Sequence, residues 1–172
     1  MAPKGERLTR QDIRMIEEEI NERKLVKRPA ILKALKEAAA MGDRSENFEY
    51  YVAKRENGIN NGRIHYLENK LRYAIVVEDA SRDDEVGMNN TVIVHFDSDD
   101  EDVLQEFRIV TSIRSDSRKG LISIESPLGK ALMGHKVGDQ VKVILDDGSF
   151  YFAEIKQLLN TGEADTDRLQ QY

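Results

Sequence analysis

Two acidic residues three positions apart, Asp43 and Glu46, lie in a short polar stretch between two segments with helical patterning. If the two helices pair, this stretch becomes the turn at the end of a rod and carries both carboxylates there. Carboxylate oxygens are ligands that magnesium prefers, but the ion takes six ligands and keeps water or borrows phosphates for most of them. The pair therefore predicts no stable metal site in the free protein, and a credible one only where another molecule completes the shell.

The same spacing is also that of a helix capping box with an acid at the cap. On spacing alone, capping is the commoner role of such a pair. Lys54 and Arg55 follow on the second helical segment. They could guide a phosphate backbone, or they could simply belong to a solvated helix face.

Other chemistries have little support in the sequence. The three histidines, His65, His95 and His135, are far apart and lack ligand spacing, and no phosphate-binding glycine loop or nucleophile elbow is present. The chain has no cysteine, which excludes disulfides and thiolate metal sites and fits a reducing cytosol.

Residues 8–41 form the first predicted helix, with isoleucines at steps of three and four, Thr9 as N-cap and Asp12 as its capping partner. Pro29 predicts a kink or short break near residues 27–28, because proline removes a backbone donor. The second helix is predicted from about residue 45 to residue 77. Gly58 and Gly62 are expected to allow close packing between two helices of about 30 residues, which form a hairpin about 45 Å long.

Beyond a polar linker at residues 79–84, the hydrophobic period falls to two, which predicts a small domain over residues 85–159. Its five expected strands are residues 91–96, 106–110, 120–124, 140–145 and 150–155. Asp146, Asp147 and Gly148 predict a hairpin turn, and Ser126 with Pro127 predicts the start of one short helix. Residues 160–172 are polar and are expected to be disordered.

The charge of the 172-residue chain is unevenly distributed. Residues 1–78 hold 16 basic and 13 acidic residues, whereas residues 79–172 hold 10 basic and 19 acidic residues, a net charge of −9. The acidic half argues against broad nucleic-acid binding there, because phosphate contacts need cations. No signal peptide or membrane-spanning stretch is visible, so a cytoplasmic protein is expected.

The tip sequence, Gly42-Asp43-Arg44-Ser45-Glu46-Asn47 with Glu49-Tyr50, resembles the tip of the bacterial Gre transcript-cleavage factors, GreA and GreB. The resemblance extends from Leu8 to about Leu158. It includes the segments Arg28-Pro29, Gly62-Arg63-Ile64, Phe107-Arg108-Ile109-Val110 and Ile122-Ser123-Ile124-Glu125-Ser126-Pro127-Leu128-Gly129.

This resemblance implies an α+β protein, in which an N-terminal antiparallel coiled-coil hairpin (residues 1–78) precedes an FKBP-like antiparallel β-sheet domain with one short helix. The domain would dock on RNA polymerase, with Glu125, Ser126 and Pro127 in the docking loop. The hairpin would enter the secondary channel. There Asp43 and Glu46, supported by Ser45 and Asn47, would help hold the second catalytic magnesium, and Lys54 and Arg55 would contact the RNA or the channel.

The implied function is stimulation of the polymerase's own cleavage of backtracked RNA at its 3′ end, by a monomeric factor that is not an enzyme on its own. The magnesium would be shared with the polymerase. A Gre-like regulator that binds the channel and inhibits is an alternative, and so is a prolyl isomerase or chaperone with a helical arm, since fold does not fix function.

Overall fold

The computed structural model describes residues 5–42, 47–101 and 103–171. The chain forms two compact units. One comprises Met1–Glu6 and Ile13–Ile75, and the other comprises Arg7–Asp12 and Val76–Tyr172. We call them the hairpin unit and the globular unit. The short segment Arg7–Asp12, at the start of the first helix, thus belongs to the globular unit.

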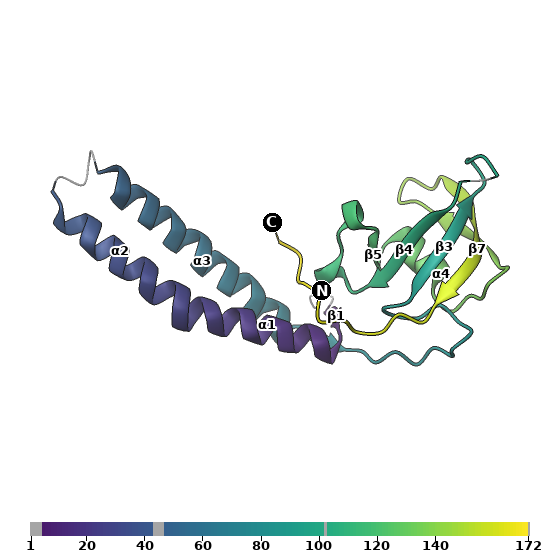
Figure 1. Ribbon diagram of the computed structural model, residues 1–172, viewed down its shortest axis with the longest axis horizontal. Coiled ribbons are helices and arrows are strands. Elements are labelled where there is room, and N and C mark those ends of the chain that lie inside the picture. Colours follow the sequence, from purple (N-terminus) through teal and green to yellow (C-terminus); the bar gives the residue numbers. More distant parts are fainter. Residues whose placement is uncertain (1–4, 43–46, 102, 172) are drawn as a thin grey trace. The chain divides into compact units, whose positions relative to one another are not determined.

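The hairpin has two helical arms that run side by side (Figure 1). The first arm consists of α1 (Arg10–Glu22), a π-helical segment (Arg23–Lys27) and α2 (Arg28–Ala40), and the second arm is α3 (Phe48–Arg72). Helix α1 begins as predicted, because the Thr9 backbone N–H donates to Asp12 Oδ2 at 2.8 Å and the Asp12 N–H donates to Thr9 Oγ1 at 3.2 Å.

The interruption predicted at Pro29 takes the form of one widened π-helical turn. The N–H of Arg28 donates to the carbonyl of Arg23, five residues earlier, and Pro29 then lies in the first turn of α2. Proline has no N–H and its ring crowds the preceding turn, and the extra residue of a π turn relieves both conflicts without ending the arm.

The close packing predicted at Gly58 and Gly62 of α3 is wrong. Gly58 and Gly62 face open space, since an added Cβ at either position would meet no atom within 4 Å, and Ile59 is 61% exposed. The buried side chains of α3 are instead Ala53, Asn60, Arg63, Ile64 and Leu67. The inner face thus contains an arginine and an asparagine, which an apolar pattern does not detect.

Helix α3 also ends earlier than predicted. Its C-cap is Tyr73, and residues 74–76 form strand β2 (Ala74–Val76), which pairs with β1 (Glu6–Leu8) in a two-stranded sheet. Strands of three residues carry too few side chains to show alternation, so the sequence pattern predicted neither.

The globular unit is built on a five-stranded sheet of order β5-β4-β3-β7-β6, with one short helix, α4 (Pro127–Leu132) (Figure 1). The strands are β3 (Thr91–Phe96), β4 (Gln105–Val110), β5 (Leu121–Ser123), β6 (Gln140–Ile144) and β7 (Phe150–Leu159). All five lie where predicted. One correction applies to the antiparallel sheet, because the edge pair β4–β5 is parallel.

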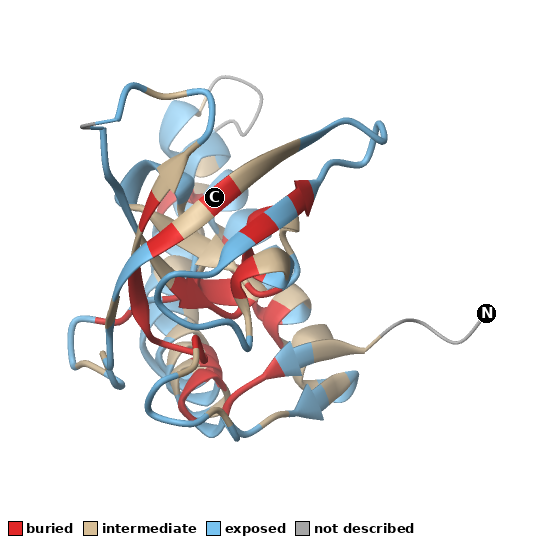
Figure 2. Cartoon of the chain, turned by 90° about the vertical axis from the view of Figure 1, so that its right-hand side faces the viewer, coloured by how far each residue is buried: buried red, intermediate tan, exposed pale blue. Residues whose placement is uncertain are grey.

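Alternation along the strands creates one core, seen as the buried positions on the strands and on α4 (Figure 2). Its fully buried members include Val92, Val94, Ile109, Leu132, Val143, Ala153 and Ile155. Gly148 adopts a φ of 85° in the predicted turn between β6 and β7. The expected architecture, a helical hairpin followed by a small sheet domain with one short helix, is confirmed.

The C-terminal segment differs from the expectation of disorder. Residues 160–171 form no helix or strand, yet Asp167 and Leu169 are buried. Low hydrophobicity alone predicted disorder, whereas one buried ion pair and one buried leucine attach the segment to the globular unit. No helix among the described residues is long and apolar enough to cross a membrane.

Candidate functional site at the hairpin tip

The tip lies between the end of α2 and the start of α3. Met41 is the C-cap of α2, Gly42 follows with a φ of 133°, and α3 begins at Phe48. The predicted site residues Asp43, Ser45 and Glu46 lie outside the described residues.

Asn47, predicted as a supporting residue, joins the two arms next to the acids. Its Oδ1 accepts a hydrogen bond from the Tyr50 N–H at 3.1 Å, so Asn47 is the N-cap of α3. Its Nδ2 donates to the carbonyl of Ala38, near the end of α2, at 2.6 Å. One side chain thereby satisfies a free donor of α3 and bonds to a carbonyl of α2, and it joins the two helices near the ends between which Asp43 and Glu46 lie in sequence.

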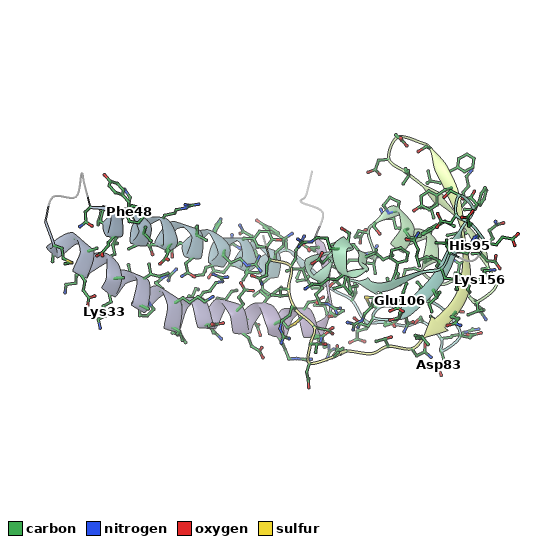
Figure 3. The ribbon with its side chains drawn as sticks, turned by 45° about the horizontal axis from the view of Figure 1, so that its top comes forward. Lys33, Phe48, Asp83, His95, Glu106 and Lys156 are labelled. Atoms are coloured by element: carbon green, nitrogen blue, oxygen red, sulfur yellow. The ribbon has the colours of Figure 1, made fainter. Side chains whose placement is uncertain are left out.

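Large apolar side chains flank the tip in exposed positions. Phe48 is 78% exposed and extends away from α3 (Figure 3), and Met41 is 77% exposed. Tyr51 is half exposed and packs edge-on against Tyr50, with ring centroids 5.9 Å apart. Exposed apolar groups gathered at one end indicate a contact surface for a partner. The sequence did not predict these exposed apolar groups.

Lys54 and Arg55 lie on exposed positions of α3, and among the described residues neither makes an ion pair or a hydrogen bond. Their charges are therefore available to an anionic partner. The interpretation as a solvated helix face predicts the same exposure.

A buried polar network holds the arms in register further along the hairpin. Arg63 donates from Nε to Glu19 Oε1 at 2.8 Å and from Nη2 to Glu19 Oε2 at 3.2 Å. Arg23 donates to Glu19 Oε1 at 2.8 Å and to Asn60 Oδ1 at 3.1 Å, and Asn60 returns a bond to the Arg23 carbonyl. Burial alone would raise the pKa of Glu19, but hydrogen bonds from the two arginines outweigh it and lower the pKa. Arg63, placed between Gly62 and Ile64, was the available sequence signal for this network.

The predicted docking residues lie on the globular unit. Ser126 is the N-cap of α4, since its Oγ accepts from the Gly129 N–H at 3.0 Å and donates to the Ser123 carbonyl at 2.6 Å, and Pro127 follows in the first turn. Glu125 is partly exposed and pairs with Arg7 at 3.3 Å. The capping role is confirmed, and the docking role stays a prediction.

A second cluster of charges, not predicted, lies in the globular unit. The guanidinium of Arg114, a residue 2% exposed, lies 2.6 Å from Asp12 Oδ1 and 3.5 Å from Asp167 Oδ2. Arg108 donates from both terminal nitrogens to Asp167, and Gln11 donates to it at 2.9 Å. Burial would raise the pKa of Asp167, but the bonds from Arg108, the Ala164 N–H and Gln11 lower it to about 2. These residues are far apart in sequence, so only the fold brings them together.

Among the described residues, no three or more acidic or histidine side chains form a group that could hold a metal ion. The histidines, predicted to have no ligand role, are likewise separate. His65 lies beside Asn69, and His95 beside the Asp100 carbonyl.

Comparison with known proteins assigns both units to one class. Residues 6–76 match the family described as "Transcription elongation factor, N-terminal", and residues 80–159 match "Transcription elongation factor, GreA/GreB, C-term". Both halves of the chain thus match the class of transcription elongation factors. It belongs to the GreA/GreB family of transcription elongation factors.

Relatives named transcription elongation factor GreA cover most of the chain. The protein of Staphylococcus saprophyticus is 42% identical over 142 residues, which span 82% of this chain and 88% of the relative. That of Streptococcus pneumoniae is 40% identical over 151 residues, spanning 87% and 93%.

Solved structures of lower identity also match. GreA factor homolog 1 of Thermus thermophilus is 22% identical with a TM-score of 0.43, and the match covers 91% of this chain and 99% of that one. A GreA/GreB factor from Nitrosomonas europaea gives a TM-score of 0.37 at 22% identity, with 89% and 98% covered.

Proposed function

We propose that this elongation factor binds bacterial RNA polymerase and stimulates cleavage of the 3′ end of backtracked RNA. The observation that carries the proposal is the tip. In the sequence, Asp43 and Glu46 lie between two helical arms that Asn47 joins, and exposed apolar groups at Met41 and Phe48 lie at the adjoining ends of those arms. Membership of the GreA/GreB family supports the same conclusion.

Asp43 and Glu46 are the residues that would hold a magnesium ion, because each supplies hard carboxylate oxygens. Two acids leave most of the shell open, so the polymerase's own carboxylates and the RNA phosphate would provide further ligands. Bound there, the ion supplies a Lewis acid and an activated water for phosphodiester hydrolysis. The role of Asn47 is to join the two helical arms beside these acids. The protein itself is a factor that completes a site in the polymerase.

The test adds the protein to a stalled, backtracked elongation complex and measures shortened RNA that can be extended again. Asp43→Asn and Glu46→Gln keep shape and remove charge, and Asn caps a helix about as well as Asp. We expect normal binding and a cleavage rate lowered by about 100-fold or more, partly restored by added magnesium. Unaltered cleavage by a normally binding Asp43→Asn protein would refute the metal role. Slowed extension without any cleavage by the wild type would indicate an inhibitor instead.

Lys54 and Arg55 would position RNA or the channel wall without taking part in chemistry. Replacing both with Ala should weaken cleavage at low protein concentration and leave the maximal rate intact, since a surface cation contributes to association. Replacing Lys33 and Lys36 on α2 with Ala removes the same charge from the other arm and serves as the control. Loss of the maximal rate with normal binding would contradict a positioning role.

Docking would use the loop of Glu125, Ser126 and Pro127. Of these three residues, Glu125 gives the clearest test, because it is exposed and does not cap α4, so its replacement should leave the fold intact. Glu125→Ala should lower affinity for polymerase with little loss of folding stability, whereas Glu106→Ala, an exposed acid on β4, should not. Equal affinities of the two variants would remove Glu125 from the docking surface.

A further inference from the structure

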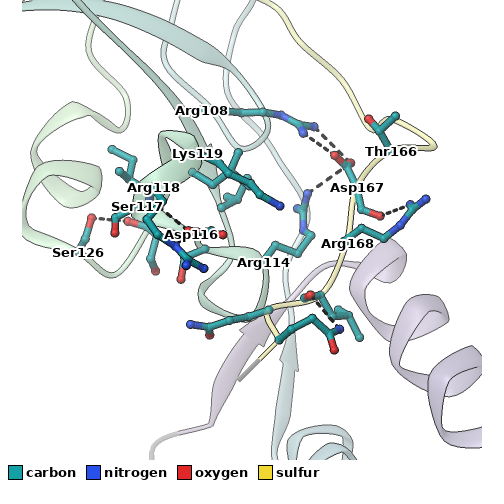
Figure 4. A pocket seen from close by; sticks show the side chains of 18 residues that line it. Arg108, Arg114, Asp116, Ser117, Arg118, Lys119, Ser126, Thr166, Asp167 and Arg168 are labelled. Atoms are coloured by element: carbon teal, nitrogen blue, oxygen red, sulfur yellow. Dashed lines mark hydrogen bonds and ion pairs between the residues drawn. The ribbon is translucent and has the colours of Figure 1, made fainter. Parts of the chain in front are cut away.

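A basic pocket lies in the globular unit (Figure 4). It has a volume of about 910 Å³ and is lined by the ends of β4 and β5, the turns at residues 115–119, and the C-terminal segment. Five of the ten basic residues of the acidic half line it, namely Arg108, Arg114, Arg118, Lys119 and Arg168, against two acids. Half of the cations in a region of net charge −9 are thus concentrated in one concavity.

The chain's own C-terminal segment already supplies one carboxylate to this pocket. Asp167, 8% exposed, accepts hydrogen bonds from Arg108 and lies 3.5 Å from Arg114 (Figure 4). The segment also makes a backbone hydrogen bond to the rest of the globular unit, from the Gln170 N–H to the Ile113 carbonyl at 2.6 Å. The Asp167 carboxylate in this pocket indicates which chemical group the pocket can bind, namely a carboxylate on a peptide chain.

The pocket retains unused binding capacity. Lys119 makes no ion pair among the described residues, and the bonds of Arg168 go to backbone carbonyls. These cations can therefore accept further acids in addition to Asp167.

The C-terminal segment buries few side chains. Residues 160–171 contain no helix or strand, and Asp167 and Leu169 are the two side chains that they bury. The segment also lies beyond residue 159, where the family match ends. Asp167 therefore lies outside the part of the globular unit that the family match covers.

We propose that this pocket binds an acidic segment of a partner protein, and that the C-terminal segment, residues 160–171, is its displaceable internal occupant. A partner carboxylate takes the place of Asp167 between Arg108 and Arg114. Neighbouring acids pair with Lys119 and Arg168, and they compete with Asp116 for Arg118, whose Nε lies 3.3 Å from Asp116 Oδ1. A nucleic acid fits less well, because the acidic surroundings repel a long polyanion and the present occupant is a peptide carboxylate. This proposal does not depend on the cleavage function.

The first experiment measures binding of a short fluorescent Asp- and Glu-rich peptide to the full chain by anisotropy at low salt. Asp167→Asn removes the internal competitor, so we expect binding at least about fivefold tighter. Asp165→Asn makes the same charge change at an exposed position whose side chain pairs with no cation in the described structure, and it should have a smaller effect. Equal effects of the two variants would overturn the competition.

Deletion of residues 160–172 removes the occupant by an independent route and should also tighten peptide binding. The paired change Arg118→Gln with Lys119→Gln should weaken it, whereas Lys142→Gln with Lys156→Gln, which removes two cations outside the pocket, should not. Unchanged affinity after the deletion, or equal loss with both pairs of lysine and arginine changes, would overturn the proposal. Tighter binding of a labelled single-stranded RNA at the same residues would assign the pocket to nucleic acid instead.

Discussion

Two single side chains, Asn47 and Asp167, each join parts of the chain that the backbone alone would leave apart. Asn47 bonds to α2 and α3 at the tip, and Asp167 bonds to Arg108 and Gln11 in the globular unit. Both act through short, directed hydrogen bonds, one neutral and one charged. Bonds to charged groups are the stronger kind, so the two residues should differ in their contribution and in their response to pH.

Asn47→Ala should destabilise the hairpin tip by about 1–2 kcal/mol, because it removes the N-cap of α3 and the bond to Ala38. Asn47→Asp keeps the capping oxygen and loses only the donor, so it should cost less. Amide hydrogen exchange at Tyr50 and Tyr51 measures both variants. Exchange in Asn47→Ala as slow as in the wild type would show that other groups hold the tip.

Asp167→Asn should lower stability by about 2 kcal/mol near neutral pH, since the pKa of Asp167 is about 2 in the folded protein against 3.8 ordinarily. Because the pKa of Asp167 is lower in the folded protein, its ionised carboxylate stabilises the fold at pH values above its pKa in the unfolded chain. That contribution disappears as the pH falls through its pKa in the folded protein. The gap between variant and wild type should therefore be full above about pH 4 and close toward about pH 2. Chemical denaturation at a series of pH values tests this, and a gap that does not change between pH 6 and pH 2 would contradict the pairing.

At the scale of elements, the hairpin is stabilised more by polar contacts than its amphipathic pattern indicates. The network of Glu19, Arg23, Asn60 and Arg63 lies at the π-helical segment, where the arm is widened and a backbone carbonyl is open to Asn60. Buried polar groups with specific partners favour one register of two helices over its neighbours. The glycines of α3, in contrast, lie on its open side.

Gly58→Ala and Gly62→Ala should each stabilise the protein by about 0.5–1 kcal/mol, because alanine restricts the unfolded chain and both positions face open space. Thermal unfolding followed by circular dichroism measures the change. Gly129→Ala is the matched control and should destabilise, since its Cβ would lie 2.0 Å from the Ser123 carbonyl oxygen. Destabilisation by the two α3 changes would restore the close-packing interpretation.

At the scale of the whole molecule, the two units do not coincide with two continuous stretches of sequence. The globular unit takes Arg7–Asp12 from the N-terminal side of the sequence, and Asp12 is the buried partner of Arg114. A domain boundary at residue 79, which the composition predicted, therefore places Asp12 and Arg114, the two partners of a buried ion pair, in different fragments. Removing one partner of such a pair leaves an uncompensated buried charge.

A fragment of residues 79–172 should therefore be less stable than the same unit in the full chain, by about 3 kcal/mol. Arg114→Met should recover part of this loss in the fragment, because it removes the charge that Asp12 no longer balances. Denaturant unfolding of the fragment, its Arg114→Met form and the full chain measures the difference. If the Arg114→Met fragment is less stable than the wild-type fragment, loss of the Asp12–Arg114 ion pair does not explain the instability of the fragment.

The sequence by itself determined the elements with strong periodicity. Residues 140–144 alternate exposed and buried positions, the isoleucines of α1 recur at helical steps, and Thr9, Ser126 and Gly148 mark local starts and turns. These features depend on neighbours within about one turn or one strand, so local spacing is enough to predict them. The tip motif likewise located the candidate acids, Asp43 and Glu46.

The tertiary structure decided which faces meet and which charges pair. Arg63 points inward on α3 and Gly62 outward, β5 joins the sheet in parallel, and Asp12, Arg114 and Asp167 share one buried cluster. The physical reason is that a buried charge is tolerated only where a partner lies within a few ångströms. In the chain, Arg114 and Asp167 lie 102 and 155 residues from Asp12, and 53 residues from each other. Local pattern carries no information about such distant pairs, because only the folded chain brings them together.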